Sequence, residues 1–189
     1  MGNPEFVKVN GKKYKINTDY KVALKCEEVA QDEEIGDYER SLAIIYLLYG
    51  DVGINNKDDY DELLRLGVKF LMCGEETSDD VDTPDMDFSQ DYGLIRASFK
   101  SDYGIVLDKE EMHWWDFNMY LNGLTEKCIL NRVRELRTYD TSQIKDIKEK
   151  DKIEKAKRKV ALKTKEPKLT QEQQKSIDTF YELTGIERK

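Results

Sequence analysis

The sequence contains few of the residues from which metal sites, disulfide frameworks and membrane anchors are built. Its 189 residues include one histidine, His113, and three cysteines, Cys26, Cys73 and Cys128, which lie far apart and show no paired spacing. Three separated cysteines argue against a disulfide framework and favour a reducing compartment. No run approaches the ~20 apolar residues that cross a membrane, and no signal peptide is visible. We therefore expect a cytoplasmic protein that does not engage a membrane.

Motifs that bind metals, phosphates or catalytic groups are also missing. A zinc site would need the three cysteines and His113 to converge from four separate helices, whereas structural zinc sites show closely spaced ligand pairs. Residues 51–62 and 80–91 have the length and acidity of a calcium loop, but both lack required residues at ligand or turn positions. The patterns GxxxxGKS/T, GxGxxG and GxSxG do not occur. We expect no metal, no cofactor and no catalytic centre, and hence a protein that is not an enzyme.

Charge is divided unevenly along the chain. Residues 126–189 carry 18 Lys and Arg against 12 Asp and Glu, a net charge of +6, so residues 1–125 must carry −14 to give the overall −8. An acidic body with a basic tail is therefore expected. The tail permits a second interpretation, a regulatory protein that associates with nucleic acid. Acids are interspersed between Lys145 and Lys163 and no aromatic residue stands there for base stacking, so nucleic acid is an unfavoured partner.

Hydrophobic periodicity predicts a mainly α protein with one N-terminal β-hairpin. Residues 7–16 form two strand-like runs around Asn10-Gly11, a pair that tolerates the positive φ angles of a type I′ turn. The rest of the chain is predicted as helices joined by loops. Helices are expected from a Thr18 N-cap, over 37–50, over 58–73, after Ser89, from an Asp108 N-cap to Gly123, and from Thr125.

The predicted helices form a compact domain at residues 7–140, followed by a basic helical C-terminal extension at residues 141–189. Residues 1–6, MGNPEF, read like a cloning scar and are excluded from the predicted fold. The helix over 37–50 is apolar on all sides, which predicts a place in the centre of the core. The predicted core residues are Leu42, Ile45, Leu48, Phe99 and Trp115.

The stretch EEMHWWDFNMYLNGL, residues 110–124, contains both tryptophans and His113. A lone histidine beside an apolar helix face is more often structural than catalytic, so we expect His113 at the margin of a packed helix. At about 100° per residue the helix has two opposite apolar faces. Either both faces are sandwiched between other helices, or one face binds a partner. One face holds Met112, Trp115 and Met119, and the candidate partner face holds Trp114, Phe117 and Leu121.

The segment FSQDYGLIRASFKSDYGIVLDKEEMHWWDFNMYLNGL, Phe88 to Leu124, resembles a family of small bacteriophage proteins. The NGKKYKI hairpin and the NRVRELRT helix match the same family, so the resemblance covers roughly Val7 to Thr138. The family resembled is that of the tail-assembly chaperones, whose genes lie between those of the major tail protein and the tape-measure protein. The resemblance implies a role in coating the tape-measure protein, keeping it soluble and guiding tail-tube subunits onto it. It also implies action in the host cytoplasm and absence from the mature virion.

The tail beyond Tyr139 is sparsely apolar, which indicates a solvated or partner-dependent helix. Near its end Ile177, Phe180 and Tyr181 stand at i, i+3 and i+4, the spacing with which a helix docks into a groove. The groove belongs to this body, to a second copy through self-association, or to the tape-measure protein. The opposite charges of body and tail favour the first two. A solvated tail with no binding role is the remaining alternative.

Overall fold

Helices make up most of the protein, and one short hairpin precedes them. The computed structural model describes residues 2–53, 56–75 and 84–163. The mainly α fold with an N-terminal hairpin is thereby confirmed. The elements are β1 (Phe6–Val9), β2 (Lys12–Lys15), α1 (Tyr20–Ala30), α2 (Asp37–Tyr49), α3 (Lys57–Leu71), α4 (Tyr92–Tyr103), the 3-10 turn η1 (Leu107–Lys109), α5 (Trp114–Asn122), α6 (Ile129–Thr138) and α7 (Ile147–Val160).

The hairpin turns where the sequence predicts. Asn10 and Gly11 have φ angles of 46° and 81°, so both occupy the left-handed region that a type I′ turn requires. The strands pair in antiparallel register, and the Ile16 N–H extends the ladder by donating to the Glu5 carbonyl at 2.8 Å. Residues 1–6 are excluded from the predicted fold. That exclusion is wrong for Phe6, because β1 begins there.

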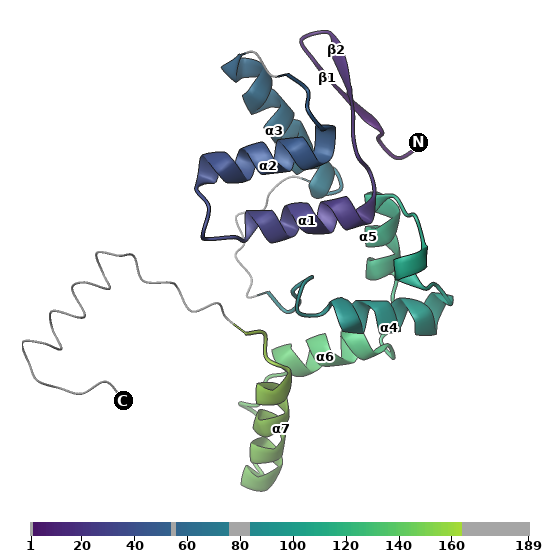
Figure 1. Cartoon of the computed structure of the whole chain (residues 1–189). Helices are drawn as coiled ribbons and strands as arrows, with labels where there is room; N and C mark the ends of the chain where they lie inside the picture. The colour runs from purple at the N-terminus through teal and green to yellow at the C-terminus, as the bar shows by residue number, and fades with distance from the viewer. Residues whose placement is uncertain (1, 54–55, 76–83, 164–189) are drawn as a thin grey trace, which may run out of the picture.

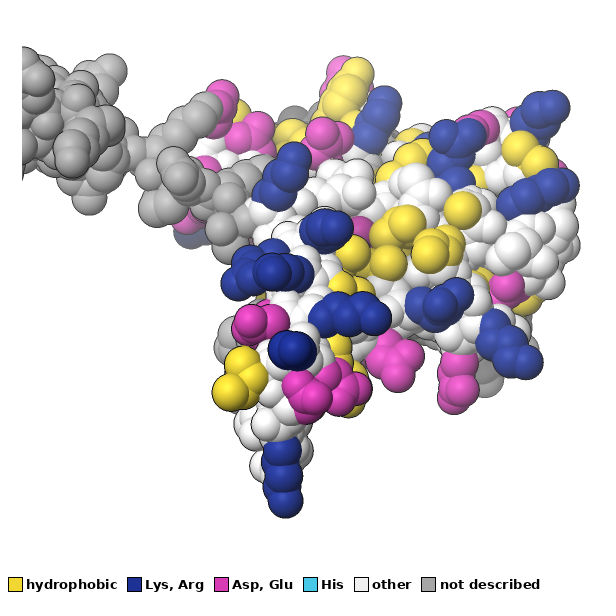
Figure 2. All heavy atoms as spheres, turned by 90° about the horizontal axis from the view of Figure 1, so that it is seen from below, with side chains coloured by type: hydrophobic (Ala, Val, Ile, Leu, Met, Phe, Trp, Pro, Cys, Tyr) yellow, Lys and Arg dark blue, Asp and Glu magenta, His cyan; other side chains and the backbone are white. Residues whose placement is uncertain are grey.

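The helices form two groups that α1 connects. The hairpin, α2 and α3 lie at one end of the molecule, and α4, α5 and α6 lie at the other (Figure 1). Helix α1 packs against both α2 and α5, and α6 packs against α4. Helix α7 packs on α6 and projects from the body, as the view from below also shows (Figure 2). This arrangement places α2 and α7 at opposite ends of the protein.

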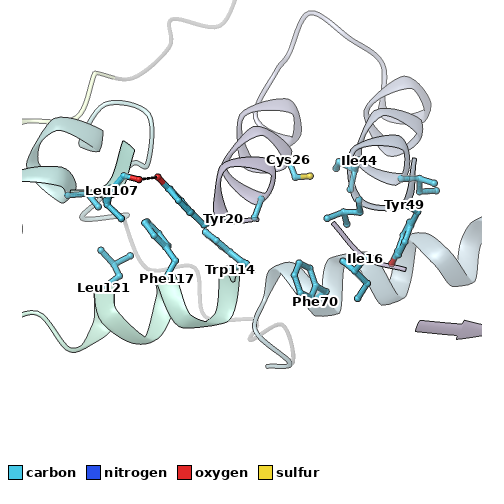
Figure 3. Packing of buried hydrophobic residues seen from close by; sticks show 14 of the residues in the cluster. Ile16, Tyr20, Cys26, Ile44, Tyr49, Phe70, Leu107, Trp114, Phe117 and Leu121 are labelled. Carbon is cyan, nitrogen blue, oxygen red and sulfur yellow. Dashed lines mark hydrogen bonds between the residues drawn. The ribbon is translucent and has the colours of Figure 1, made fainter. Parts of the chain in front are cut away.

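Stacked aromatic rings fill the junction between α1, α4 and α5. The Phe117 ring stacks on Tyr20, Phe99 and Trp114 at centroid distances of 4.9, 5.3 and 5.5 Å. The Tyr20 hydroxyl donates to the Leu107 carbonyl at 2.7 Å, which satisfies its polar end inside the core (Figure 3). Each such large side chain contributes about 1.5–3 kcal/mol when it is fully buried.

The predicted core is correct for three of its five residues. Ile45, Leu48 and Phe99 are buried, whereas Leu42 is 39% exposed and Trp115 is only partly buried. Within the described residues α2 packs mainly against α1 and α3, and part of its outer side stays exposed. The prediction that this helix occupies the centre of the core is therefore wrong.

Two helices begin later than the sequence predicts, for one shared reason. Residues 18–20 and 112–114 run antiparallel, with the Trp114 N–H donating to the Thr18 carbonyl at 2.7 Å. This extended pairing holds both segments out of helical geometry. The N-cap of α1 is accordingly Asp19, and that of α5 is His113. Asp108, predicted to cap α5, lies in η1 instead.

Candidate protein-interaction surface

Helix α2 uses one face to hold the core together. Ile44, Ile45, Leu48 and Tyr49 are buried, and Figure 3 shows Ile44 and Tyr49 on the inner side of the helix. The Tyr49 hydroxyl donates to the Leu63 carbonyl of α3 at 3.2 Å. The two helices approach so closely that a Cβ at Gly67 would lie 2.9 Å from the Leu48 Cδ1. Any larger residue at position 67 would therefore force the Leu48 side chain to shift.

The opposite face of α2 is also apolar, and the described chain leaves much of it exposed. Tyr38 is 63% exposed, Leu42 39% and Tyr46 65%. Their spacing of four residues aligns them along the helix. The Tyr38 ring contacts the Tyr60 ring of α3 at a centroid distance of 5.8 Å, so the apolar strip continues toward α3. We call Tyr38, Leu42 and Tyr46 the α2 surface.

A groove of about 820 Å³ adjoins the α2 surface at Tyr46. It runs along the start of α1, the end of α2 and the segment before α5. The half-buried side chains of Val22, Leu47 and Met112 contribute apolar area to its lining. The α2 surface and this groove together offer a partner both an exposed strip and a hollow.

The stretch of chain that contains the α2 surface is rich in acids. Residues 27–62 contain 12 Asp and Glu but only two cationic residues, Arg40 and Lys57. Arg40 pairs with Asp37 at 3.1 Å and donates to the carbonyls of Ala30 and Ile35. The Arg40 guanidinium is thus bound to groups of its own chain. An apolar strip with an acidic rim favours a partner that carries cations beside apolar residues.

The candidate partner residues of α5 lie inside the core instead. Trp114 is 2% exposed, Phe117 0% and Leu121 5%, which corrects their prediction as a partner face. Tyr20 of α1 and Phe99 of α4 cover them, two neighbours far away in sequence. The opposite face is the more open one, since Trp115 and Met112 are half-buried and Met119 is 59% exposed.

Both tryptophans form hydrogen bonds with carbonyl groups at the end of α3. The indole N–H of Trp114 donates to the Leu71 carbonyl at 2.7 Å, and that of Trp115 donates to the Phe70 carbonyl at 2.9 Å. The last carbonyls of a helix have no partner within the helix. Both indoles therefore cap α3 from a neighbouring helix.

His113 caps α5 and binds the N-terminal segment. Its Nδ1 accepts from the Trp115 N–H at 3.0 Å, which leaves the proton on Nε2, 3.1 Å from the Pro4 carbonyl. Asp116, three residues later, does not pair with the ring but accepts from the Asn3 amide at 2.7 Å. His113 thus stands at the partly buried edge of the helix, with both ring nitrogens bonded to backbone groups.

The cysteines show no sign of a shared site. Burial raises the pKa of the Cys26 thiol to about 12 and that of Cys73 to about 11. No group of three or more His, Cys, Asp and Glu in the described ranges is placed to hold a metal ion. Within the same ranges no helix is long and apolar enough to cross a membrane.

A buried ion pair between α6 and the start of α4 also bonds to the end of α7. Arg137 of α6 binds Asp91 through two hydrogen bonds of 2.7 Å and donates to the Val160 carbonyl at 2.6 Å. Burial acts to raise the pKa of the Asp91 carboxyl, but the hydrogen bonds from Arg137 and the Asp87 N–H outweigh it and hold that pKa below its usual value. The carboxylate is therefore ionised over the whole neutral range.

Comparison with known families identifies the chain. The family model described as bacteriophage Gp15 protein matches residues 3–162. The chain belongs to the bacteriophage Gp15 protein family. The Gp15 match extends through α7, so α7 is part of the family sequence and the likeness reaches well beyond Thr138. No curated protein and no solved structure matches the chain.

Ile177, Phe180 and Tyr181 lie outside the described residues. Tyr38 and Tyr46 are not among the predicted partner residues, although a signal for them exists. The all-round apolar character of 37–50 consists of two stripes, one of which packs between α1 and α3 while the other remains exposed.

Proposed function

We propose that this member of the bacteriophage Gp15 protein family is a non-enzymatic tail-assembly chaperone that binds the tape-measure protein of its phage. In this role it keeps the tape-measure protein soluble, assists tail-tube assembly together with the major tail protein, and does not remain in the mature virion. Membership of a bacteriophage family and the resemblance to tail-assembly chaperones support the proposal. It acts in the cytoplasm of the bacterial host.

The observation that carries this proposal is the exposed α2 surface. A helix that is apolar on both faces would be sandwiched in a protein that works alone. Here Tyr38 and Tyr46 are about two-thirds exposed, at 63% and 65%. Apolar strips of this kind, rimmed by polar residues, are typical of protein interaction sites. Tyrosine suits this role because its ring buries a large area while its hydroxyl stays hydrated.

The partner segment expected here is an amphipathic helix. Helices dock with apolar residues at i, i+3, i+4 and i+7, which matches the four-residue spacing of the α2 surface. Fully burying one large apolar side chain contributes about 1.5–3 kcal/mol, so three anchors can support a weak and reversible complex. Reversibility suits a chaperone that must release its client.

Co-expression with the tape-measure protein of the same phage tests the proposal. The wild-type chain is expected to keep the tape-measure protein soluble and to co-purify with it. The double variant Leu42→Asp, Tyr46→Asp is expected to lose both effects. Its matched control is Met119→Asp, Ile129→Asp, which places two acids on apolar positions that are 59% and 42% exposed elsewhere on the body. The proposal fails if the wild-type chain neither solubilises nor retains the tape-measure protein.

A shortened chain that ends at Lys163 separates the role of the tail from that of the body. Equal co-purification by the full and shortened chains would remove Ile177, Phe180 and Tyr181 from the interaction. Loss of binding only in the shortened chain would assign the interaction to residues 164–189 and not to the α2 surface.

A nucleic-acid-associated regulator is the second candidate, and one observation favours it. The exposed side of α7 is strongly cationic. We call this side the basic α7 face, and it consists of Lys148, Asp151, Lys152, Lys155, Arg158 and Lys159. Retention on a DNA column that falls steeply with salt would support this function. No retention at low salt would eliminate it.

A further inference from the structure

Surfaces of opposite charge lie at opposite ends of this protein. Residues 27–62, which include α2, carry a net charge of −10. Helix α7 has seven Lys and Arg against three Asp and Glu. Figure 1 places α2 at one end of the molecule and α7 at the other, and Figure 2 shows Lys and Arg crowded around the projecting α7. The basic α7 of one copy is therefore attracted to the acidic region around α2 of a second copy.

The basic α7 face also fits the α2 surface in chemistry. Long cationic side chains pack their stems on apolar area and place their charge over tyrosine rings. The hairpin already shows this contact, with the Lys12 Nζ 4.7 Å from the Tyr14 ring centroid. At the edge of the basic α7 face Ile147 is 77% exposed. Ile147 is therefore available as an apolar anchor beside the cations.

Helix α7 is held away from the α2 surface of its own chain. Arg137 donates to the Val160 carbonyl at 2.6 Å, and the Lys157 Nζ donates to the Tyr139 carbonyl at 2.5 Å. Gln90 and Lys163 exchange two further hydrogen bonds, of 3.1 and 2.8 Å. These bonds fasten α7 along α6 and beside the start of α4. A contact between α7 and the α2 surface must therefore join two copies.

We propose that the basic α7 face of one copy covers the α2 surface of a second copy, so that the protein associates with itself head to tail. In such a contact one copy still has a free α2 surface and the other still has a free α7, so the assembly grows into short chains or closed rings. The lysine and arginine charges meet the acidic rim of the α2 surface, and Ile147 meets its apolar strip.

This contact regulates the access of a client to the α2 surface. The regulatory part rests on the proposed function, because it requires that a client bind the α2 surface. Without client, the α7 of a neighbour shields Tyr38, Leu42 and Tyr46 from nonspecific contacts. A client with greater affinity displaces α7 and releases the neighbour. Self-association and client binding then exclude one another.

Sedimentation velocity of the full chain tests the self-association directly. The protein is treated with nuclease and examined over a concentration series at about 50 mM and about 500 mM NaCl, because salt at the higher level screens surface charges. We expect species larger than a monomer at low salt, with an apparent Kd that rises at least about tenfold at high salt. A monomer at all concentrations and at both salt levels would overturn the proposal.

Charge reversal on either surface is expected to abolish association. One variant is Lys155→Glu, Arg158→Glu, and the other is Glu39→Lys, whose residue is exposed on the solvent side of α2. Each alone should be monomeric, whereas their mixture should form dimers, because the unchanged α7 of the Glu39→Lys variant can bind the unchanged α2 surface of the α7 variant. The control Lys109→Glu, Lys127→Glu changes the net charge by the same amount as the α7 variant, at exposed positions outside both surfaces. Association that survives the α7 variant, or is lost equally in the control, would disprove the interface.

Two outcomes separate this inference from its alternatives. Association that depends on nucleic acid and disappears after nuclease treatment would assign the basic α7 face to nucleic acid and overturn the inference. Added tape-measure protein is expected to convert the oligomers into one-to-one complexes. If the tape-measure protein does not bind but the salt-sensitive oligomers form, the proposed function fails while the self-association stands. If the tape-measure protein binds and no oligomers form, the self-association fails while the proposed function stands.

Discussion

Arg137 and Asp91 form a bidentate ion pair across the junction of α6 and α4. Two guanidinium nitrogens lie 2.7 Å from the two carboxylate oxygens, and the side chains are 11% and 2% exposed. The same guanidinium donates to the carbonyls of Asp85 and Val160. One arginine therefore connects the loop before α4, the start of α4, and the end of α7.

Breaking this pair from one side is expected to be costly. Arg137→Met leaves the buried Asp91 carboxylate without its partner, and we expect a loss of about 3–5 kcal/mol in the free energy of unfolding. The double variant Arg137→Met, Asp91→Leu removes both charges and should be more stable than Arg137→Met alone. Urea unfolding of the variants measures these differences. If the double variant loses as much stability as Arg137→Met and Asp91→Leu lose together as single variants, the two side chains do not form the stabilising pair.

The ion pair also predicts a dependence of stability on acid. Because the folded pKa of Asp91 lies below its unfolded value, the pair stabilises the protein fully above the unfolded pKa of about 3.9. This contribution disappears as the pH falls through the lower, folded pKa. Urea midpoints at neutral pH and at about pH 3 should therefore differ more for the wild type than for Arg137→Met, Asp91→Leu. Equal losses in both proteins would show that other carboxylates dominate the acid response.

The ion pair shows where reasoning from sequence stops. Asn10-Gly11 predicts its hairpin because the turn depends on the backbone freedom of two adjacent residues. Helix α2 is equally local, since its boundaries follow from its own apolar run and from Gly50. The Arg137–Asp91 pair joins residues 46 positions apart, and no local pattern marks either one. It becomes visible only once α4 and α6 are packed together.

Substitution of the two tryptophans is expected to lower the free energy of unfolding by different amounts. Trp114→Ala removes a side chain that is 2% exposed and stacked on Phe117, so we expect a loss of about 3–5 kcal/mol. Trp115→Ala should cost less because that ring is only partly buried, although its bond to the Phe70 carbonyl is lost. Thermal and urea unfolding test the order of the two variants. A greater loss for Trp115→Ala would contradict the burial described here.

The orientation of α5 is the second feature that sequence cannot supply. Trp114, Phe117 and Leu121 form a stripe no more apolar than that of Met112, Trp115 and Met119, so periodicity predicts two faces without ranking them. Tyr20, nearly a hundred residues earlier, stacks on Phe117 and decides which face is buried. The same limit applies to α2, whose outer stripe remains largely exposed although α1 and α3 pack against the helix.

Substitution of His113 is expected to affect stability and not client binding. His113→Ala removes the acceptor for the Trp115 N–H, and the loss of an N-cap costs about 1 kcal/mol. His113→Asn restores a good N-cap and should recover most of this loss, although the bond to the Pro4 carbonyl is gone. Urea unfolding measures the first effect, and co-purification with the tape-measure protein measures the second. Loss of binding in a fully folded His113→Asn variant would assign the ring a functional role.

The α2 surface is expected to separate stability from binding most clearly. Tyr38→Ser and Tyr46→Ser replace side chains that are 63% and 65% exposed, so each should change the free energy of unfolding by no more than about 0.5 kcal/mol. Both should weaken binding of the tape-measure protein and also reduce self-association, because both contacts use the same tyrosines. Tyr49→Ser is the matched control on the same helix, since that ring is 9% exposed and its hydroxyl bonds the Leu63 carbonyl. We expect Tyr49→Ser to lower stability strongly through the cavity it creates. If Tyr38→Ser and Tyr46→Ser instead destabilise the protein as much as Tyr49→Ser does, the outer stripe belongs to the core and the α2 surface cannot be the binding site.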